Sequence, residues 1–441
     1  MSLAAAYPVF RVDAWSTLHL GGPEAEWDAP PLTHRDYRLL AKLHQGNRLE
    51  VRETRHGLEI NTGRYIGYIA FEHFAVGIRP GIDHRHLQRM IQFTYGIDDL
   101  DFYPHLGEAP VEDFPIQDLL IKGLVHHVDG LVRQGLFHDY VERQENLAAC
   151  RGAIVFAQVA RNPGARVELP CRFEDRTADV LVNRVLLGGL ALARRLTRNP
   201  GLLGDIGRLQ ALLGAYVERI SLSDDVFRRA YRELTRLNVH YRPAIDLCYL
   251  LLREATLAEG GTSSHHFPTF LLDMAQLFER FIGKLLKTLA PPGLRVVDQH
   301  TISYYTAPPG QTAPRLRPDF MIRDEEGRLV TIVDSKYKFF DRRPVDVGDL
   351  YQLTIYGLAD APVTGRVVAL YPASTGPAGD GFGLLPPGRF RARRGYVYGV
   401  KGTPGRELQV VFRPVDLDRV WDVLQSPEPA VRAAFFAELL A

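Results

Sequence analysis

Two aspartates and a lysine stand at a spacing that could support metal-dependent hydrolysis. Asp319 follows a proline, and Asp334 and Lys336 are separated by one serine. Two carboxylates can bind a hard divalent cation, and a nearby ammonium group can orient water and stabilise negative charge on a phosphate. The trio therefore indicates a site for phosphodiester cleavage. Taken alone, the same pattern also fits a solvated strand edge with a salt bridge.

The residues between the two aspartates predict a β-hairpin. Apolar residues 320–322 and 329–333 flank the turn sequence Asp-Glu-Glu-Gly. Such a hairpin brings Asp319 and Asp334 together at one end, and strand alternation puts Lys336 on the same face as Asp334. The second strand is rich in β-branched residues, so we expect a central strand, where an unneutralised charge needs a functional reason.

The elements after the hairpin predict an α/β core. Residues 349–356 form a helical stretch that puts Gln352 and Tyr356 on one face, one turn apart. Residues 366–371 then predict another buried strand. Polar groups would therefore converge at one edge of a sheet.

This arrangement resembles the PD-(D/E)xK nuclease superfamily. Pro318-Asp319 and Asp334-Ser-Lys336 match its signature, and Gln352 and Tyr356 resemble the Gln-x-x-x-Tyr motif of its RecB-like branch. The string Asp-Ser-Lys-Tyr-Lys, followed by Asp-Leu-Tyr-Gln, is similar to the McrC family of the McrBC modification-dependent restriction system. Shorter matches to that family occur in order at residues 63–80, 140–152 and 170–184. The resemblance therefore covers most of the chain.

An acidic residue upstream is a further candidate. Proteins of the superfamily often carry a glutamate on a helix before the hairpin, and residues 271–286 have helical periodicity with Glu279 at that place. The alternative is a surface glutamate that pairs with Arg280 or Lys284.

The resemblance implies a role for each candidate. Asp319, Asp334 and the Ser335 carbonyl would hold Mg²⁺, with Mn²⁺ as a possible substitute, and Glu279 could complete the metal site. Lys336 would orient the attacking water. Gln352 would position a phosphate or the lysine, and Tyr356 would support it.

The resemblance also implies partners. The chain contains no Gly-x-x-x-x-Gly-Lys-(Ser/Thr) phosphate loop, so we expect it to bind no nucleotide itself. In the family the motor is a separate AAA+ GTPase, a McrB-like hexamer. Residues 1–260 would dock on it and stimulate GTP hydrolysis. The expected substrate is modified double-stranded DNA, and double-strand cutting predicts self-association of the nuclease domain.

Composition limits how the chain could bind DNA. Its 53 basic and 52 acidic residues give a net charge of +1, so any DNA-binding surface must be a local patch. Basic residues cluster around the predicted site, and the candidates for phosphate contacts are Arg317, Lys338, Arg342 and Arg343. The alternative is a solvated loop. We expect a cytoplasmic enzyme with no membrane partner, because no apolar run approaches a membrane span and residues 1–10 lack a basic signal segment.

The 441 residues predict a multidomain α+β protein. We expect a β-rich N-terminal domain at 1–115, a mainly helical region at 116–262 and an α/β PD-(D/E)xK nuclease domain at 263–441. The predicted N-terminal strands are 9–12, 49–55, 57–61, 65–71 and 74–79, with helices at 36–44 and 84–94. The predicted middle helices are 116–133, 180–196, 206–220, 226–237 and one from 241 onward.

Two other functions remain open. The chain could be an adaptor that activates the motor through a nuclease fold without activity, although the intact Asp, Asp and Lys disfavour this. It could also be a stand-alone RecB-like repair nuclease. The large N-terminal half disfavours that function, because a nuclease domain needs only about 150–200 residues.

Overall fold

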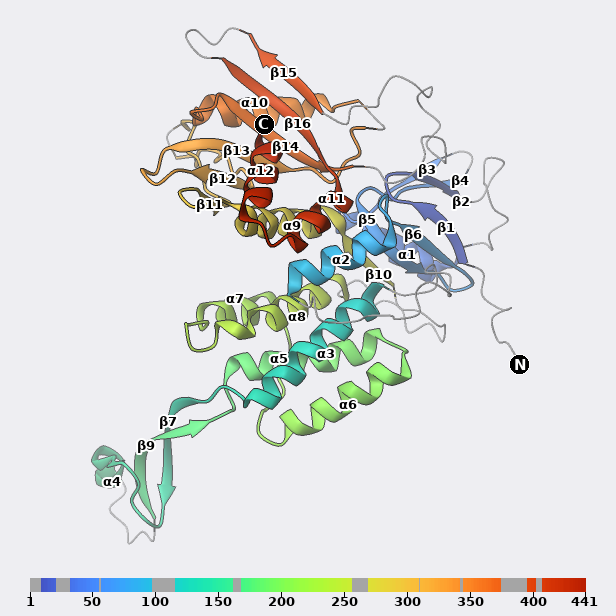
Figure 1. The fold of residues 1–441 in the computed structure, drawn as a ribbon. Coiled ribbons are helices and arrows are strands. Elements are labelled where there is room, and N and C mark those ends of the chain that lie inside the picture. Colours follow the sequence, from blue (N-terminus) through green and yellow to red (C-terminus); the bar gives the residue numbers. More distant parts are fainter. Residues whose placement is uncertain are drawn as a thin grey trace. The chain divides into compact units, whose positions relative to one another are not determined.

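The computed structural model describes residues 9–20, 32–54, 57–96, 116–161, 168–255, 269–308, 310–341, 344–373, 395–401 and 407–441. Arg342, Arg343 and the predicted boundary at 262/263 lie outside these residues. The described chain is a mixed α+β structure with several sheets, as the sequence predicts (Figure 1). It divides into two compact units, residues 9–96 with 271–441 and residues 116–255 with 269–270. No helix among the described residues is long and apolar enough to cross a membrane.

The N-terminal part of the first unit contains two small sheets and two helices. The four-stranded sheet has the order β1-β6-β5-β10, and the three-stranded sheet has the order β2-β4-β3. The elements are β1 (Val9–Asp13), β2 (Thr17–Leu20), α1 (His34–Gln45), β3 (Glu50–Thr54), β4 (Gly57–Asn61), β5 (Tyr65–Ala70), β6 (Ala75–Arg79) and α2 (His84–Tyr95). All of the elements predicted here are present, and β2 is additional. Helix α1 begins with a capping box formed by Thr33 and Asp36.

The second unit is built mainly from helices. They are α3 (Ile116–Gln134), α4 (Phe156–Arg161), α5 (Leu181–Leu196), α6 (Pro200–Gly214), α7 (Asp224–Arg232), η2 (Val239–Tyr241) and α8 (Arg242–Ala255). Helices α5 and α8 approach closely at Gly189, where an added Cβ would lie 2.1 Å from the Cys248 sulfur. The α6 and α7 predictions were shifted toward the C-terminus. The caps that start these helices were not used: Asn199 before a proline for α6, and Ser223 for α7.

The second unit also contains a sheet that the sequence analysis did not predict. Strand β9 (Leu169–Thr177) pairs antiparallel with β7 (Asp139–Leu147) and with the short β8 (Ala153–Ile154). Nearly all of β7 is exposed on both faces. A strand with two solvated faces has no apolar alternation, and therefore lacks the sequence signal of a half-buried strand.

The C-terminal part of the first unit is a six-stranded mixed sheet with flanking helices. The strand order is β11-β12-β13-β14-β16-β15, and β13, β14 and β16 are parallel. The elements are β11 (Arg295–Asp298), β12 (Phe320–Arg323), β13 (Leu329–Ser335), α10 (Val347–Ala359), β14 (Arg366–Pro372), β15 (Tyr396–Val400), β16 (Leu408–Val415), α11 (Leu417–Gln425) and α12 (Pro429–Leu440). The predicted hairpin, the helix after it and the next strand are all present.

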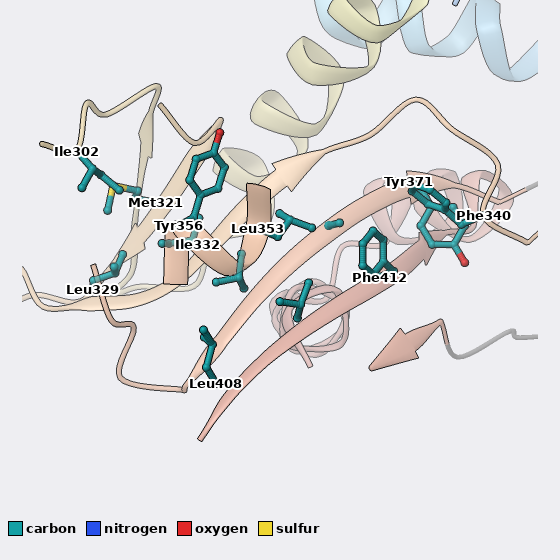
Figure 2. Close-up of a cluster of buried hydrophobic side chains, with 13 residues drawn as sticks. Ile302, Met321, Leu329, Ile332, Phe340, Leu353, Tyr356, Tyr371, Leu408 and Phe412 are labelled. Atoms are coloured by element: carbon teal, nitrogen blue, oxygen red, sulfur yellow. The ribbon is translucent and has the colours of Figure 1, made fainter. Parts of the chain in front are cut away.

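Helices α9 (Met274–Leu289) and α10 cover opposite faces of this sheet. Met321 of β12 belongs to a buried cluster that includes Leu353 and Tyr356 of α10 (Figure 2). The neighbouring Phe320 lies against Gly283 of α9. Successive residues of a strand point to opposite faces, so the hairpin is enclosed between the two helices.

The predicted helix at 271–286 begins later than expected. Leu271 and Leu272 belong to strand β10 (Phe270–Asp273), which joins the N-terminal four-stranded sheet. Asp273 then caps α9 by accepting hydrogen bonds from the N–H groups of Ala275 (3.0 Å) and Gln276 (3.2 Å). The apolar spacing of residues 271–286 does not show where the strand ends and the helix begins. The cap at Asp273 marks that point. One segment thus completes the N-terminal sheet and starts the helix that carries Glu279.

Candidate active site

The β12–β13 hairpin brings the two predicted aspartates together. Phe320 pairs with Val333 in the antiparallel register, so Asp319 and Asp334 face each other one position further along. Asp319 Oδ2 accepts hydrogen bonds from the Ser335 N–H (2.7 Å) and the Ser335 hydroxyl (2.6 Å). Asp334 is only 2% exposed. The structure therefore places both carboxylates at one end of the hairpin, as predicted.

Lys336 lies on the same face as Asp334 and starts a chain of hydrogen bonds. Its Nζ is 2.8 Å from Asp334 Oδ2 and donates to Gln352 Oε1, also at 2.8 Å. Gln352 Nε2 donates to the Tyr356 hydroxyl (2.7 Å), which donates to the Arg317 carbonyl (3.3 Å). An ammonium group only donates, so the Gln352 amide oxygen must face Lys336. The hydroxyl of Tyr356 points away from the apolar cluster that holds its ring (Figure 2).

Glu279 reaches the site through a glutamine that the sequence analysis missed. The Gln299 N–H donates to the Asp319 carbonyl (2.7 Å), and its Nε2 donates to Glu279 Oε1 (2.8 Å). Its Oε1 accepts from the Arg317 guanidinium. Gln299 has a φ of 45°, in the left-handed region. Its side chain both donates and accepts, which lets it join an acidic residue to a basic one.

The two basic neighbours of Glu279 extend toward α2. Arg280 donates to the Tyr95 hydroxyl (3.5 Å), and the Lys284 ammonium donates to the Phe93 carbonyl. Arg280 is also close enough to Glu279 that its charge acts to lower the pKa of that carboxyl group.

Lys338 is held by acidic residues of α10 and the turn before it. Its Nζ donates to Asp349 Oδ2 (2.7 Å) and lies 3.7 Å from Asp346 Oδ2. Asp349 is buried, and its other oxygen is 3.7 Å from Lys336 Nζ. Asp349 therefore contributes to the electrostatics of both lysines, a role that the sequence analysis did not assign.

Burial and mutual repulsion govern the protonation of the acidic residues. Burial raises the pKa of Asp334 to about 7, with a further contribution from the negative charge of Asp319. Burial also raises the pKa of Glu279, and Asp319 adds to the effect. Burial acts to lower the pKa of Lys336, but the combined effects of Asp334, Asp349 and Asp319 outweigh it, and the net change is upward. Lys336 is therefore cationic at neutral pH.

The carboxylate pair fits a divalent cation. Asp334 Oδ2 accepts no hydrogen bond of favourable geometry from the described residues, although the Lys336 ammonium is nearby. Mg²⁺ is commonly bound by one or two carboxylates and several waters. Among the described residues, no group of three or more His, Cys, Asp or Glu side chains is compact enough for a metal ion. The fit thus rests on Asp319 and Asp334, with Glu279 outside a compact cluster.

The sequence matches the model of a protein family over residues 60–372, a range that contains every residue of this site. That family is described as the McrBC 5-methylcytosine restriction system component. The chain belongs to the McrBC family. The resemblance to the McrBC system inferred from the sequence motifs is therefore confirmed.

Solved structures related to the McrBC family are also similar to this chain. One is a refined half-complex from a tetradecameric assembly of Thermococcus gammatolerans McrB AAA+ hexamers with bound McrC. The similarity has a TM-score of 0.56 at 17% identity and covers 98% of this chain and 99% of that one. The other is the cryo-EM structure of the Thermococcus gammatolerans McrBC complex (TM-score 0.43, 19% identity, 64% and 88% coverage). No curated protein matches the chain. The first similarity shows a shared fold over nearly the whole length.

Two residues of the site carried little or no sequence signal. Gln299 lies after β11, well before the hairpin motif, and only its pairing with the Asp319 carbonyl reveals its place. Asp349 stands within the string that resembles the McrC family, which was a usable signal. Its contact with Lys338, however, depends on how α10 packs on the sheet.

Proposed function

We propose that this McrBC-family chain is the McrC-type subunit of its restriction system and acts as a Mg²⁺-dependent DNA endonuclease. The observation that carries the proposal is that Asp319 faces the buried Asp334 beside the cationic Lys336. A divalent cation bound between two carboxylates offsets the repulsion of their negative charges. An ammonium group beside them can bind a phosphate and stabilise its negative charge. A pair that served only structure would not need two aspartates facing each other at the end of a central strand.

Each residue of the site has a defined task in this proposal. Mg²⁺ would be held by Asp319, Asp334 and the Ser335 carbonyl, where it would supply Lewis-acid activation of a water molecule. Lys336 orients the attacking water and stabilises the charge that develops on the phosphate. Gln352 accepts a hydrogen bond from Lys336 and fixes the direction of its ammonium group, while Tyr356 holds Gln352.

Glu279 has a secondary role in the proposal. Gln299 holds it, and its carboxylate is affected by the charge of Asp319. It would add negative potential next to the metal site and could become a ligand when the ion is bound. Arg317 would contact a phosphate beside the site.

The partner in this proposal is an AAA+ GTPase. Support comes from family membership and from the similar structure, which is described as McrB AAA+ hexamers with bound McrC. Residues 1–260 would dock on such a hexamer and stimulate its GTP hydrolysis, and the nuclease parts would self-associate to cut both strands. The substrate would be modified double-stranded DNA, the chain itself would bind no nucleotide, and the complex would act in the cytoplasm.

A cleavage assay with the assembled complex tests the proposal. Asp334→Ala and Lys336→Ala should each reduce Mg²⁺-dependent cleavage by roughly 100-fold or more, while stimulation of the partner's GTP hydrolysis is unchanged. Glu326→Ala, in the exposed turn of the same hairpin, is the matched control and should cut normally. Cleavage that survives both active-site substitutions would refute the assignment.

The same assay separates the two alternatives. Full-rate cleavage by the isolated chain would identify a stand-alone nuclease of the RecB-like type. Stimulation of the GTPase without any cleavage by the wild-type complex would identify an adaptor.

A further inference from the structure

The β11–β12 hairpin extends beyond its named strands and carries a long loop next to the candidate active site. Past β11, the Gln299 N–H bonds to the Asp319 carbonyl (2.7 Å). Further along, Ile302 and Leu316 exchange two backbone hydrogen bonds of 2.8 and 3.0 Å. Ile302 is buried in the cluster under the sheet (Figure 2). The described residues of the loop that follows, 303–308 and 310–315, therefore start and end at the paired Ile302 and Leu316, three positions from Asp319.

The chemistry of this segment differs from that of an ordinary surface loop. No acidic residue occurs between Asp298 and Asp319. Arg315 and Arg317 are exposed, and neither forms an ion pair within the described part of the chain. The loop therefore carries positive charge and no acidic residue of its own, within a protein whose net charge is only +1. The charge of Glu279, which Gln299 links to Arg317, acts on the Arg317 side only.

Two adjacent aromatic side chains are exposed on the same loop. Tyr304 is 46% exposed and Tyr305 is 40% exposed. Their rings contact each other edge to face, with centroids 5.2 Å apart. An exposed aromatic pair leaves ring faces open to a flat partner. Exposed aromatic rings next to arginines are typical of surfaces that bind single nucleic-acid strands. Bases stack on the rings, and the guanidinium groups bind the phosphates.

The site's own hydrogen bonds fix the loop base. The Arg317 carbonyl accepts from the Tyr356 hydroxyl (3.3 Å), and its guanidinium donates to Gln299. The loop thus joins the chain of side chains that leads through Gln352 to Lys336. A strand whose phosphate reached Asp319 and Asp334 would have its neighbouring nucleotides next to this loop.

We propose that this loop contacts DNA: Tyr304 and Tyr305 stack on nucleobases beside the scissile phosphate, and Arg315 and Arg317 bind flanking phosphates. This inference rests on the proposed nuclease function and specifies how the substrate is held. Bases of an intact duplex are stacked on each other, so the loop requires a base that is unstacked near the cut. The loop should therefore bind best where the DNA duplex is locally opened or distorted next to the cut.

Photocrosslinking in the full complex tests this contact. The Asp334→Ala chain, which keeps the loop but should not cut, is bound with its GTPase partner to duplex DNA that carries 5-iodouracil at single positions. The crosslinked peptides are then identified by mass spectrometry. We expect crosslinks at Tyr304 or Tyr305 from a narrow window of positions, centred on the bond that the wild-type complex cuts. Crosslinks at other aromatic residues only would overturn the proposal.

Affinity measurements with substituted loops provide the second test. The double variant Tyr304→Ala, Tyr305→Ala should bind this DNA about 5- to 100-fold more weakly, with an unchanged melting temperature. The corresponding Phe variant keeps the ring faces and should bind like the wild type. Tyr37→Ala is the control, since Tyr37 is 50% exposed on α1, and should have no effect.

The outcomes separate this proposal from the proposed function. Wild-type cutting together with normal DNA affinity of the double Ala variant would overturn the loop contact and leave the nuclease assignment intact. The double Ala variant could also keep its DNA affinity but lose self-association, as measured by sedimentation. That result would overturn the loop contact, because the tyrosines would then contact a protein and not DNA. A wild-type complex that never cuts would refute the nuclease, and the crosslinks would still report on the loop.

Discussion

At the level of single residues, Asp334 is where burial and charge conflict most directly. It is 2% exposed, and burial together with Asp319 raises its pKa to about 7, against a usual value of 3.8. The Lys336 ammonium offsets only part of this penalty. A carboxylate that is costly to ionise without a cation is suited to bind one, because metal binding favours the deprotonated form.

The raised pKa predicts how the metal-free protein responds to pH. Between about pH 4 and pH 7, Asp334 is ionised in the unfolded chain and protonated in the folded one, so folding takes up a proton. Its contribution to the free energy of unfolding is therefore greatest below pH 4 and is lost as pH rises toward 7. The size is about 1.4 kcal/mol for each unit of pKa difference. Chemical denaturation of the wild type and of Asp334→Asn at several pH values measures this contribution.

Asp334→Asn is the control because it cannot ionise, so the difference between the two proteins isolates this residue. Saturating Mg²⁺ should reduce the pH dependence by stabilising the ionised form. A difference that stays constant from pH 4 to pH 7 would show that Asp334 titrates normally.

At the level of elements, the packing of α9 on β12 positions the acidic residues from both. Gly283 of α9 faces Phe320, and an added Cβ would lie 2.7 Å from the Phe320 ring. Phe320 directly follows Asp319, and Glu279 stands one turn before Gly283 on the same helix. The close approach at Gly283 therefore sets how near the helix and the hairpin can come.

Gly283→Ala should destabilise the protein and impair the site together. The extra methyl group must push α9 or the Phe320 ring aside, which typically costs about 1–3 kcal/mol. Thermal denaturation and Mg²⁺-dependent cleavage measure the two effects. Gly204→Ala, in α6 with nothing within 4 Å of the new Cβ, is the matched control and should stabilise by about 0.4–1 kcal/mol. Equal behaviour of both variants would contradict the packing argument.

At the level of the whole molecule, the N-terminal part of the first unit is joined to the C-terminal part through α2. Trp421 of α11 donates a buried hydrogen bond to His86 Nδ1 (3.1 Å). Its ring contacts Phe93 of α2 and Phe281 of α9, with centroids 6.4 and 5.7 Å apart. Together with strand β10, these contacts tie residues at the two ends of the sequence into one compact unit.

Trp421→Ala should destabilise the protein and also loosen the connection between the N-terminal and C-terminal parts of the first unit. Loss of a buried tryptophan costs about 3–5 kcal/mol, and the loss falls on contacts between α2, α9 and α11. Differential scanning calorimetry should show a lower melting temperature and a transition that splits in two. Trp421→Phe keeps a ring but leaves His86 without its donor, so it should have an intermediate effect. A single transition at the wild-type temperature in the Ala variant would contradict this role.

Much of the candidate site could be predicted because its information is local. Alternation places Asp334 and Lys336 on one face, a four-residue turn brings Asp319 opposite, and helical spacing aligns Gln352 with Tyr356. The start of α9 was wrong by three residues, because Leu271 and Leu272 fit a strand and a helix equally well. Strand β7 was missed because both of its faces are exposed.

The sequence by itself determined the McrBC family membership, the hairpin and the identity of its acidic and basic residues, since each depends on neighbours a few positions apart. Only the tertiary structure decided that Gln299 links Glu279 to Arg317, that α2 packs on α9 and that β10 completes the N-terminal sheet. It also decided that the two strands leading to Tyr304 and Tyr305 pair through Gln299 and Asp319 and through Ile302 and Leu316. These features depend on contacts between distant segments, which form only when the whole unit buries its apolar surface.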